Sequence, residues 1–150
     1  MEITATAGFY LAYRRVCTII VSPAGGWLAD KYGINTVYLL STALTISGLF
    51  LIASGLVIPG IIVTFTFYSL SNAMSPGNAS AGAQNHIKAV ATNSTWTDTG
   101  AAAGTLIGGF VLYSVHPTII FFIGSFVLVT ALVVYSKSTN FLFKHSVRWK

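Results

Sequence analysis

The sequence has very few charged side chains. Among its 150 residues, Lys and Arg number 8, Asp and Glu number 3, and charged residues amount to 7% of the chain. A soluble domain typically carries about 25% charged residues, because its surface must meet water. Hydrophobic residues make up 54% of this sequence. The composition therefore disfavours a soluble globular protein and predicts an integral membrane protein.

Groups that support enzyme or metal chemistry are also scarce. The single cysteine, Cys17, rules out a disulfide within the chain, and its place in an apolar run predicts a buried, inert thiol. The three histidines, His86, His116 and His145, lack the spacing of zinc ligands. The sequence holds no phosphate-binding loop and no convincing nucleophile–base pair. We therefore predict that the protein is not an enzyme and has no metal or cofactor.

Five apolar runs dominate the chain, and each is expected to form a membrane-spanning helix of about 20 residues. They cover residues 5–27, 36–57, 61–74, 90–114 and 118–135. The third run is expected to end in a break or kink at Ser75-Pro76-Gly77. The runs are continuous rather than alternating, which favours helices over a barrel, and short connections predict antiparallel neighbours. The predicted fold is an all-α membrane protein of about five helices, with residues 1–150 forming a single transmembrane region.

Most basic residues fall in alternate connections. The first connection, the third connection and the tail hold six of the eight: Lys31, Lys88, Lys137, Lys144, Arg148 and Lys150. The connections around Pro59 and His116 hold none. Because basic segments stay on the cytoplasmic side, we predict a multi-pass protein of the plasma or inner membrane with a cytoplasmic C-terminus. Anionic lipid accounts for the basic tail, so no nucleic-acid partner is predicted.

The stretch GGWLADKYG, residues 25–33, interrupts the apolar pattern between the first two runs. It resembles the cytoplasmic loop motif of the major facilitator superfamily, G-x-L-A-D-[RK]-x-G-[RK]-[RK]. The matching residues are Gly26, Leu28, Ala29, Asp30, Lys31 and Gly33. Ile34 and Asn35 stand where the family usually has basic residues. We expect Gly33 to adopt a positive φ, Gly26 to allow a close approach at a helix end, and Asp30 to cap the next helix or pair with a basic group.

A second stretch, GAAAGTLIGG at residues 100–109, resembles the family's glycine-rich pattern G-x-x-x-G-P-x-x-G-G, with Thr105 in place of the proline. The spacing between the two motifs fits either half of such a transporter. The C-terminal half is favoured, because YSLSNAMSPG at residues 68–77 lacks the arginine motif of the fourth helix and the tail is basic. The resemblance then implies the eighth to twelfth of about twelve helices. The chain would be a fragment without the first helix of that half, and the missing N-terminal half would be its partner.

The resemblance implies a secondary active transporter that moves a small solute by alternating access, coupled to protons or another ion and without a cofactor. Five helices would supply at most one wall of the solute pathway. An alternative is a non-transporting integral membrane protein that packs against a partner through Gly100, Gly104 and Gly108, which recur every four residues. An intramembrane hydrolase is disfavoured, because no His lies in a predicted helix near a Ser.

Candidate transport residues are polar or charged side chains within the apolar runs. Asp98 lies about 200° round its helix from Gly100, so it faces away from the glycine stripe and shares a small polar surface with Thr95. A charge within a membrane usually faces a cavity or a partner, so Asp98 could carry a coupling proton or form a structural ion pair. Arg14 and Arg15 lie at mid-membrane depth, where one could bind an anionic solute, pair with Asp98 or extend toward head groups. Weaker candidates are Tyr10, Tyr13, Tyr68, Asn72 and Trp96.

Overall fold

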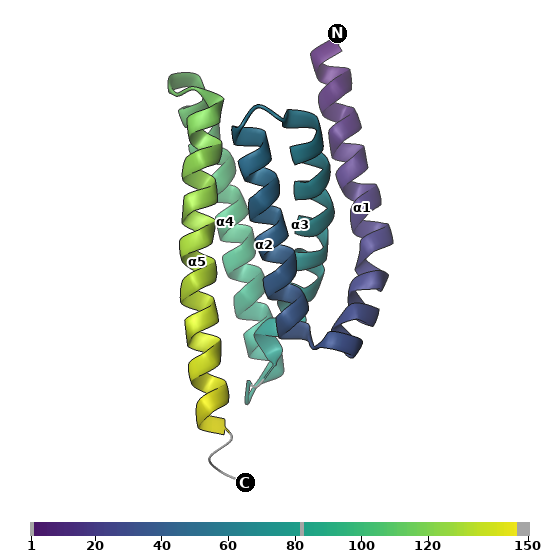
Figure 1. The fold of residues 1–150 in the computed structure, drawn as a ribbon, viewed down its shortest axis with the longest axis vertical. Coiled ribbons are helices and arrows are strands. Elements are labelled where there is room, and N and C mark those ends of the chain that lie inside the picture. The colour runs from purple at the N-terminus through teal and green to yellow at the C-terminus, as the bar shows by residue number, and fades with distance from the viewer. Residues whose placement is uncertain (1, 82, 147–150) are drawn as a thin grey trace.

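The computed structural model describes residues 2–81 and 83–146, which form five α-helices and no strand (Figure 1). The helices are α1 (Glu2–Tyr32), α2 (Ile34–Ala53), α3 (Val57–Ser80), α4 (His86–Ser114) and α5 (Pro117–Ser146). Each overlaps one of the apolar runs, so the prediction of five helices is confirmed, although α2 ends at Ala53, before the predicted end of its run at residue 57. The basic tail residues Arg148 and Lys150 lie outside the described residues.

The predicted break at Ser75-Pro76-Gly77 is wrong, because α3 continues four residues beyond Pro76. A proline inside a helix removes one backbone hydrogen bond and crowds the preceding turn. Contacts outside α3 hold the last turn in place. The side chain of Ile34 fills the space beside Gly77, and Asn78 donates a hydrogen bond to Tyr135 of α5.

The helices form a bundle around α2 and α3, each of which contacts three other helices. α3 contacts α1, α2 and α4, while α2 also contacts α1 and α5. Within the described chain α1 and α4 do not contact each other, because they flank α3. Figure 1 shows α1 and α5 at opposite edges of the bundle. It also shows the α1–α2 and α3–α4 connections at the same end as the C-terminal end of α5.

The tightest packing joins α2 and α3. A Cβ added at Gly48 would lie 2.8 Å from the backbone nitrogen of Thr64, and one at Gly60 would lie 2.7 Å from that of Ile52. Glycine at these positions lets the two backbones approach more closely than any larger residue would. The sequence singled out neither glycine.

Beside this contact, a small apolar core of Val37, Leu70 and Met74 packs against α1. A Cβ at Gly25 would lie 2.6 Å from Leu70 Cδ1, whereas one at Gly26 would meet nothing within 4 Å. The close approach predicted for Gly26 is therefore wrong and belongs to its neighbour Gly25. Gly26 is also not at a helix end, because α1 runs on to Tyr32.

The turn between α1 and α2 is a single residue. Gly33 has φ of 84°, which confirms the predicted positive φ, and it serves as the N-cap of α2. No side chain donates or accepts a capping hydrogen bond there. The predicted cap by Asp30 is therefore wrong: this residue lies in the last turn of α1 with its side chain exposed.

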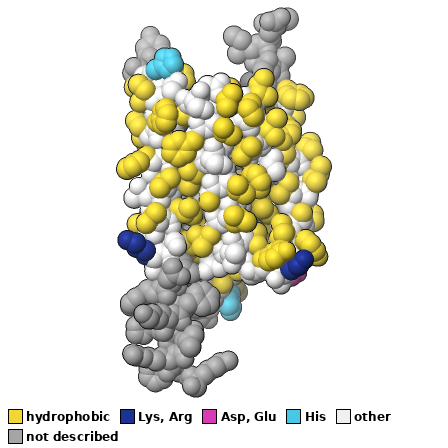
Figure 2. Space-filling model, viewed as in Figure 1, with side chains coloured by type: hydrophobic (Ala, Val, Ile, Leu, Met, Phe, Trp, Pro, Cys, Tyr) yellow, Lys and Arg dark blue, Asp and Glu magenta, His cyan; other side chains and the backbone are white. Residues whose placement is uncertain are grey.

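Three helices are long and apolar enough to cross a membrane: α2, α3 and the first part of α5, Pro117–Lys137. In the described residues α1 and α4 do not reach that threshold. α1 holds Arg14 and Arg15, and α4 holds Asp98 within a run of Ser and Thr. Figure 2 shows hydrophobic side chains over the middle of the visible face and Lys or Arg side chains only near one end.

Candidate functional site

The structure brings three candidate residues of α1 and α3 together. The guanidinium carbon of Arg14 lies 5.0 Å from the centroid of the Tyr68 ring, a distance suited to a cation–π contact. Asn72 follows Tyr68 by one helical turn, and both side chains are exposed. A cation, an aromatic ring and an amide therefore lie on one open face.

Hydroxyl groups between α1 and α3 fix the rotation of α1. Tyr13 OH lies 3.3 Å from Thr66 Oγ1, and Thr18 Oγ1 lies 3.2 Å from Ser69 Oγ. Cys17 is buried beside them with its Sγ 4.0 Å from Thr66 Oγ1, in agreement with the predicted buried thiol. Arg15 lies about 60° round α1 from Thr18, on the side away from Cys17, and its side chain is exposed.

The open face of α3 lies between its contacts with α1 and α4. Asn93 of α4 donates from Nδ2 to Ser75 Oγ at 3.0 Å, whereas Ser69 contacts α1. Asn72 is three residues from both Ser69 and Ser75, so it lies about 60° round α3 from each. We call the exposed residues Arg14, Arg15, Tyr68, Asn72 and Asp98 the polar face.

Asp98 lies on the α4 edge of the polar face. It follows Asn93 by five residues, or about 140° round the helix, and its side chain is exposed. Thr95 and Trp96 are exposed as well, and the Thr95 hydroxyl donates to the Ala91 carbonyl of its own helix at 3.0 Å. Within the described residues Asp98 does not pair with Arg14 or Arg15, because α1 and α4 are separated by α3.

The predicted glycine stripe of α4 is open in this structure. A Cβ added at Gly100, Gly104 or Gly108 would meet nothing within 4 Å. The close helix contacts of the described chain use Gly25, Gly48 and Gly60 instead. The described residues do not cover the stripe, so its packing against another helix stays a prediction.

One polar cluster was missed from the sequence. Asn78 donates from Nδ2 to Tyr135 OH at 2.6 Å, and Tyr135 OH donates to Asn35 Oδ1 at 2.7 Å. The cluster ties α2, α3 and α5 together at the end that carries Lys31. Tyr38 packs edge-on against the Tyr135 ring at 5.5 Å. The sequence feature that could have indicated this cluster is Asn35, which stands where the resembled motif has a basic residue.

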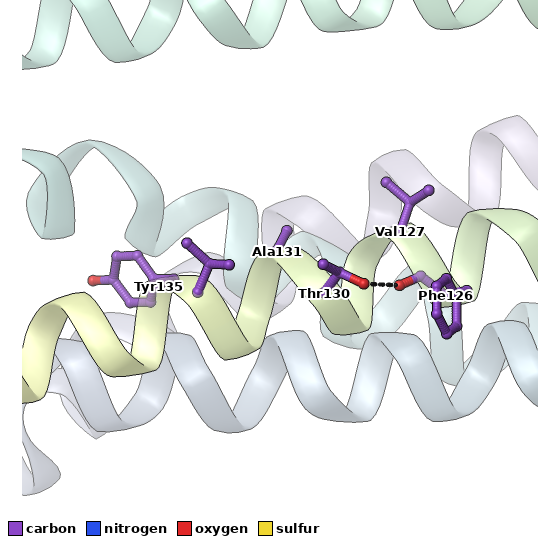
Figure 3. A pocket seen from close by; sticks show the side chains of 6 residues that line it. Phe126, Val127, Thr130, Ala131 and Tyr135 are labelled. Carbon is purple, nitrogen blue, oxygen red and sulfur yellow. Dashed lines mark hydrogen bonds between the residues drawn. The ribbon is translucent and has the colours of Figure 1, made fainter.

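An apolar groove of about 690 Å³ runs along α5 (Figure 3). Its lining residues all belong to that helix: Phe126, Val127, Thr130, Ala131, Val134 and Tyr135. Thr130 donates its hydroxyl to the Phe126 carbonyl at 2.9 Å. No charged residue lines the groove, and the hydroxyls of Thr130 and Tyr135 already donate hydrogen bonds within the protein, so few polar groups are left to orient a solute.

The described residues contain no group of three His, Cys, Asp or Glu side chains that could hold a metal. No family model, curated protein or solved structure matches this chain.

Proposed function

We propose that this chain is part of a secondary active membrane transporter of the major facilitator type, with α1, α3 and α4 as one wall of its solute pathway. The observation that supports this most is the distribution of charge. Arg14, Arg15 and Asp98 lie on α1 and α4, beside the open face of α3, whereas Ile34–Ala53 and residues 117–136 contain no charged residue.

The cost of burying charge explains why this distribution matters. A charged residue at the centre of a spanning helix costs at least about 2.5–3.5 kcal/mol, so it usually faces water or a partner. In this proposal α2 and α5 face lipid and α3 presents its open face to an aqueous pathway. Arg14, held against Tyr68, attracts an anionic group of the solute, and Asn72 offers hydrogen bonds beside it.

Asp98 is the proposed coupling residue. It is the one acidic side chain of the polar face, and gaining or losing a proton changes the charge of that face by one unit. Movement of α4 against an opposing wall would expose it to one side of the membrane and then to the other. The resemblance implies that the opposing wall is the N-terminal half of the same transporter.

Membrane orientation gives the first test. In a Cys17→Ser background, Lys31→Cys and Lys137→Cys are expected to react with a membrane-impermeant maleimide only from the cytoplasmic side. Ser54→Cys, in the α2–α3 connection, is the control at the opposite end and should react only from outside. The physical reason is that basic ends remain cytoplasmic. Labelling of Lys31→Cys and Lys137→Cys from opposite sides would contradict the proposal.

Proton coupling gives the second test. In the complete transporter, Asp98→Asn is expected to reduce solute-evoked proton flux about a hundredfold or more, the lower end of what a positioned proton-transfer group contributes. Thr99→Ala is the control, because its hydroxyl bonds only to the Thr95 carbonyl of the same helix. The measurement is the pH change in membrane vesicles on addition of amino acids, sugars or organic anions. Equal proton flux in Asp98→Asn and the wild type would remove Asp98 from the coupling step.

A further inference from the structure

The middle of α4 is not covered by the other helices that the structure describes. Every residue from Ser94 to Ile107 is exposed, a length of about 20 Å at 1.5 Å per residue. Asp98 lies within this segment and has no oppositely charged partner among the described residues. Lipid cannot solvate a carboxylate. If the chain crosses a membrane as proposed above, this segment must face water or another protein surface, so it belongs opposite the second wall of the pathway.

The other edge of the polar face carries the opposite charge. Arg15 is exposed on α1 and has no acidic partner among the described side chains. The positions of Arg15 and Asp98 along the bundle axis can be compared because the Thr18–Ser69 contact aligns α1 with α3 and the Ser75–Asn93 contact aligns α4 with α3. Counted at 1.5 Å per residue, Arg15 and Asp98 differ by about 6 Å along the bundle axis, which a flexible arginine side chain spans.

We propose that the opposing wall of the pathway is a second copy of this chain rather than a separate N-terminal half, with α1 of each copy against α4 of the other at the two edges of the polar face. A two-fold axis parallel to the helices and opposite Asn72 brings each α1 edge to the other copy's α4 edge, because α1 and α4 flank α3. Arg15 of each copy then pairs with Asp98 of the other. A single symmetry operation satisfies both pairs, as an isologous interface requires.

Membrane orientation and side-chain size agree with this arrangement. A two-fold axis along the membrane normal keeps the basic ends of both copies on the same side, as the positive-inside bias requires. The α4 edge offers small residues, including Ala101 and Thr105, while the α1 edge presents Leu11, which is 60% exposed. Small residues on one helix opposite larger ones on another permit close packing in lipid.

Disulfide trapping tests the geometry, because Cys17 is the sole cysteine. Two tagged chains, both Cys17→Ser, are co-expressed in membranes, one with Leu11→Cys and the other with Thr105→Cys, positions of similar depth. An oxidant is expected to join them. Phe9→Cys replaces Leu11→Cys in the control, because Phe9 is at least as exposed as Leu11 but lies about 200° round α1 from it. Failure to trap the Leu11 pair, or equal trapping of the Phe9 pair, would overturn the proposal.

Charge exchange tests the pairing itself. Fluorescent chains in liposomes are followed by energy transfer as the lipid-to-protein ratio rises. Arg15→Glu and Asp98→Arg are each expected to weaken self-association about tenfold or more, because each leaves like charges opposed. The two substitutions in one chain restore opposite charges and should restore association. Wild-type chains that remain monomeric, or a double variant as weak as the single ones, would contradict self-pairing.

These results are separable from the transport proposal. One outcome is that wild-type chains stay monomeric while Asp98→Asn abolishes proton flux in the complete transporter. The transport proposal would then stand, and the opposing wall would belong to another chain. The opposite outcome is specific disulfide trapping of Leu11→Cys with Thr105→Cys while Asp98→Asn leaves proton flux unchanged. Self-pairing would then stand, and Asp98 would have no role in coupling. Circular dichroism of each variant shows whether its helices have formed.

Discussion

Gly48→Ala is expected to destabilise the bundle by about 1–3 kcal/mol, the usual cost of forcing extra atoms into a packed interior. The added Cβ would lie 2.5 Å from Thr64 Oγ1 and 2.8 Å from the Thr64 backbone nitrogen. A side-chain rotation could relieve the first contact, but only a shift of α3 relieves the second. Because α2 and α3 form the tightest helix pair, that shift would also disturb the contacts that α3 makes with α1 and α4.

The prediction needs a control, because replacing glycine with alanine inside a helix favours the helix by about 1 kcal/mol. Gly124→Ala in α5 supplies it, since a Cβ at Gly124 would meet nothing within 4 Å. We expect Gly124→Ala to leave stability unchanged or raise it slightly, and Gly48→Ala to lower it. The measurement is the loss of helical circular dichroism with rising SDS in mixed micelles. Equal midpoints for the two variants would show that α2 and α3 are not packed as closely as described.

The sequence predicted the helices well because the length and polarity of an apolar run are local properties. Five runs gave five helices, and Gly33 was correctly assigned a positive φ. The helix break expected at Pro76 is absent, because contacts from Ile34 and Tyr135, which lie far away in the sequence, hold the last turn of α3 in place. Propensity is a weak prior where tertiary packing holds a segment in place.

The candidate site was predicted only in part, because helical periodicity shows which residues share a face but not which face meets a neighbour. Spacing placed Gly100, Gly104 and Gly108 together, yet the close contacts fall at Gly25 and Gly48. The contact of Arg14 with Tyr68 joins residues of two helices. The sequence named both residues as candidates but gave no indication that they would meet.

The Asn35–Tyr135–Asn78 cluster shows the same limit most clearly, because Asn35 and Tyr135 are 100 residues apart. Tyr135 lies near the end of an apolar run, where an aromatic residue is commonly an interface anchor. In the structure its hydroxyl instead joins two amides from different helices. α5 thereby gains a polar attachment to both α2 and α3, in addition to its apolar contact with α2.

Tyr135→Phe is accordingly expected to destabilise the bundle by about 2–4 kcal/mol, because it strands two amides at roughly 1–3 kcal/mol each and their partial exposure keeps the sum toward its lower end. The ring and its contact with Tyr38 are retained, so the change isolates the hydroxyl. Tyr32→Phe is the matched control, since the exposed Tyr32 hydroxyl makes no hydrogen bond within the described residues. The same SDS titration measures both variants.

A second substitution separates the hydrogen bonds from the ring. Adding Asn78→Leu to Tyr135→Phe removes one stranded amide, so the double variant should lose less stability than the sum of the two single variants. Strict additivity would mean that Asn78 and Tyr135 stabilise the bundle independently, in spite of the 2.6 Å between them. If Tyr135→Phe instead unfolds at the same SDS concentration as Tyr32→Phe, apolar contact alone holds α5 against the bundle.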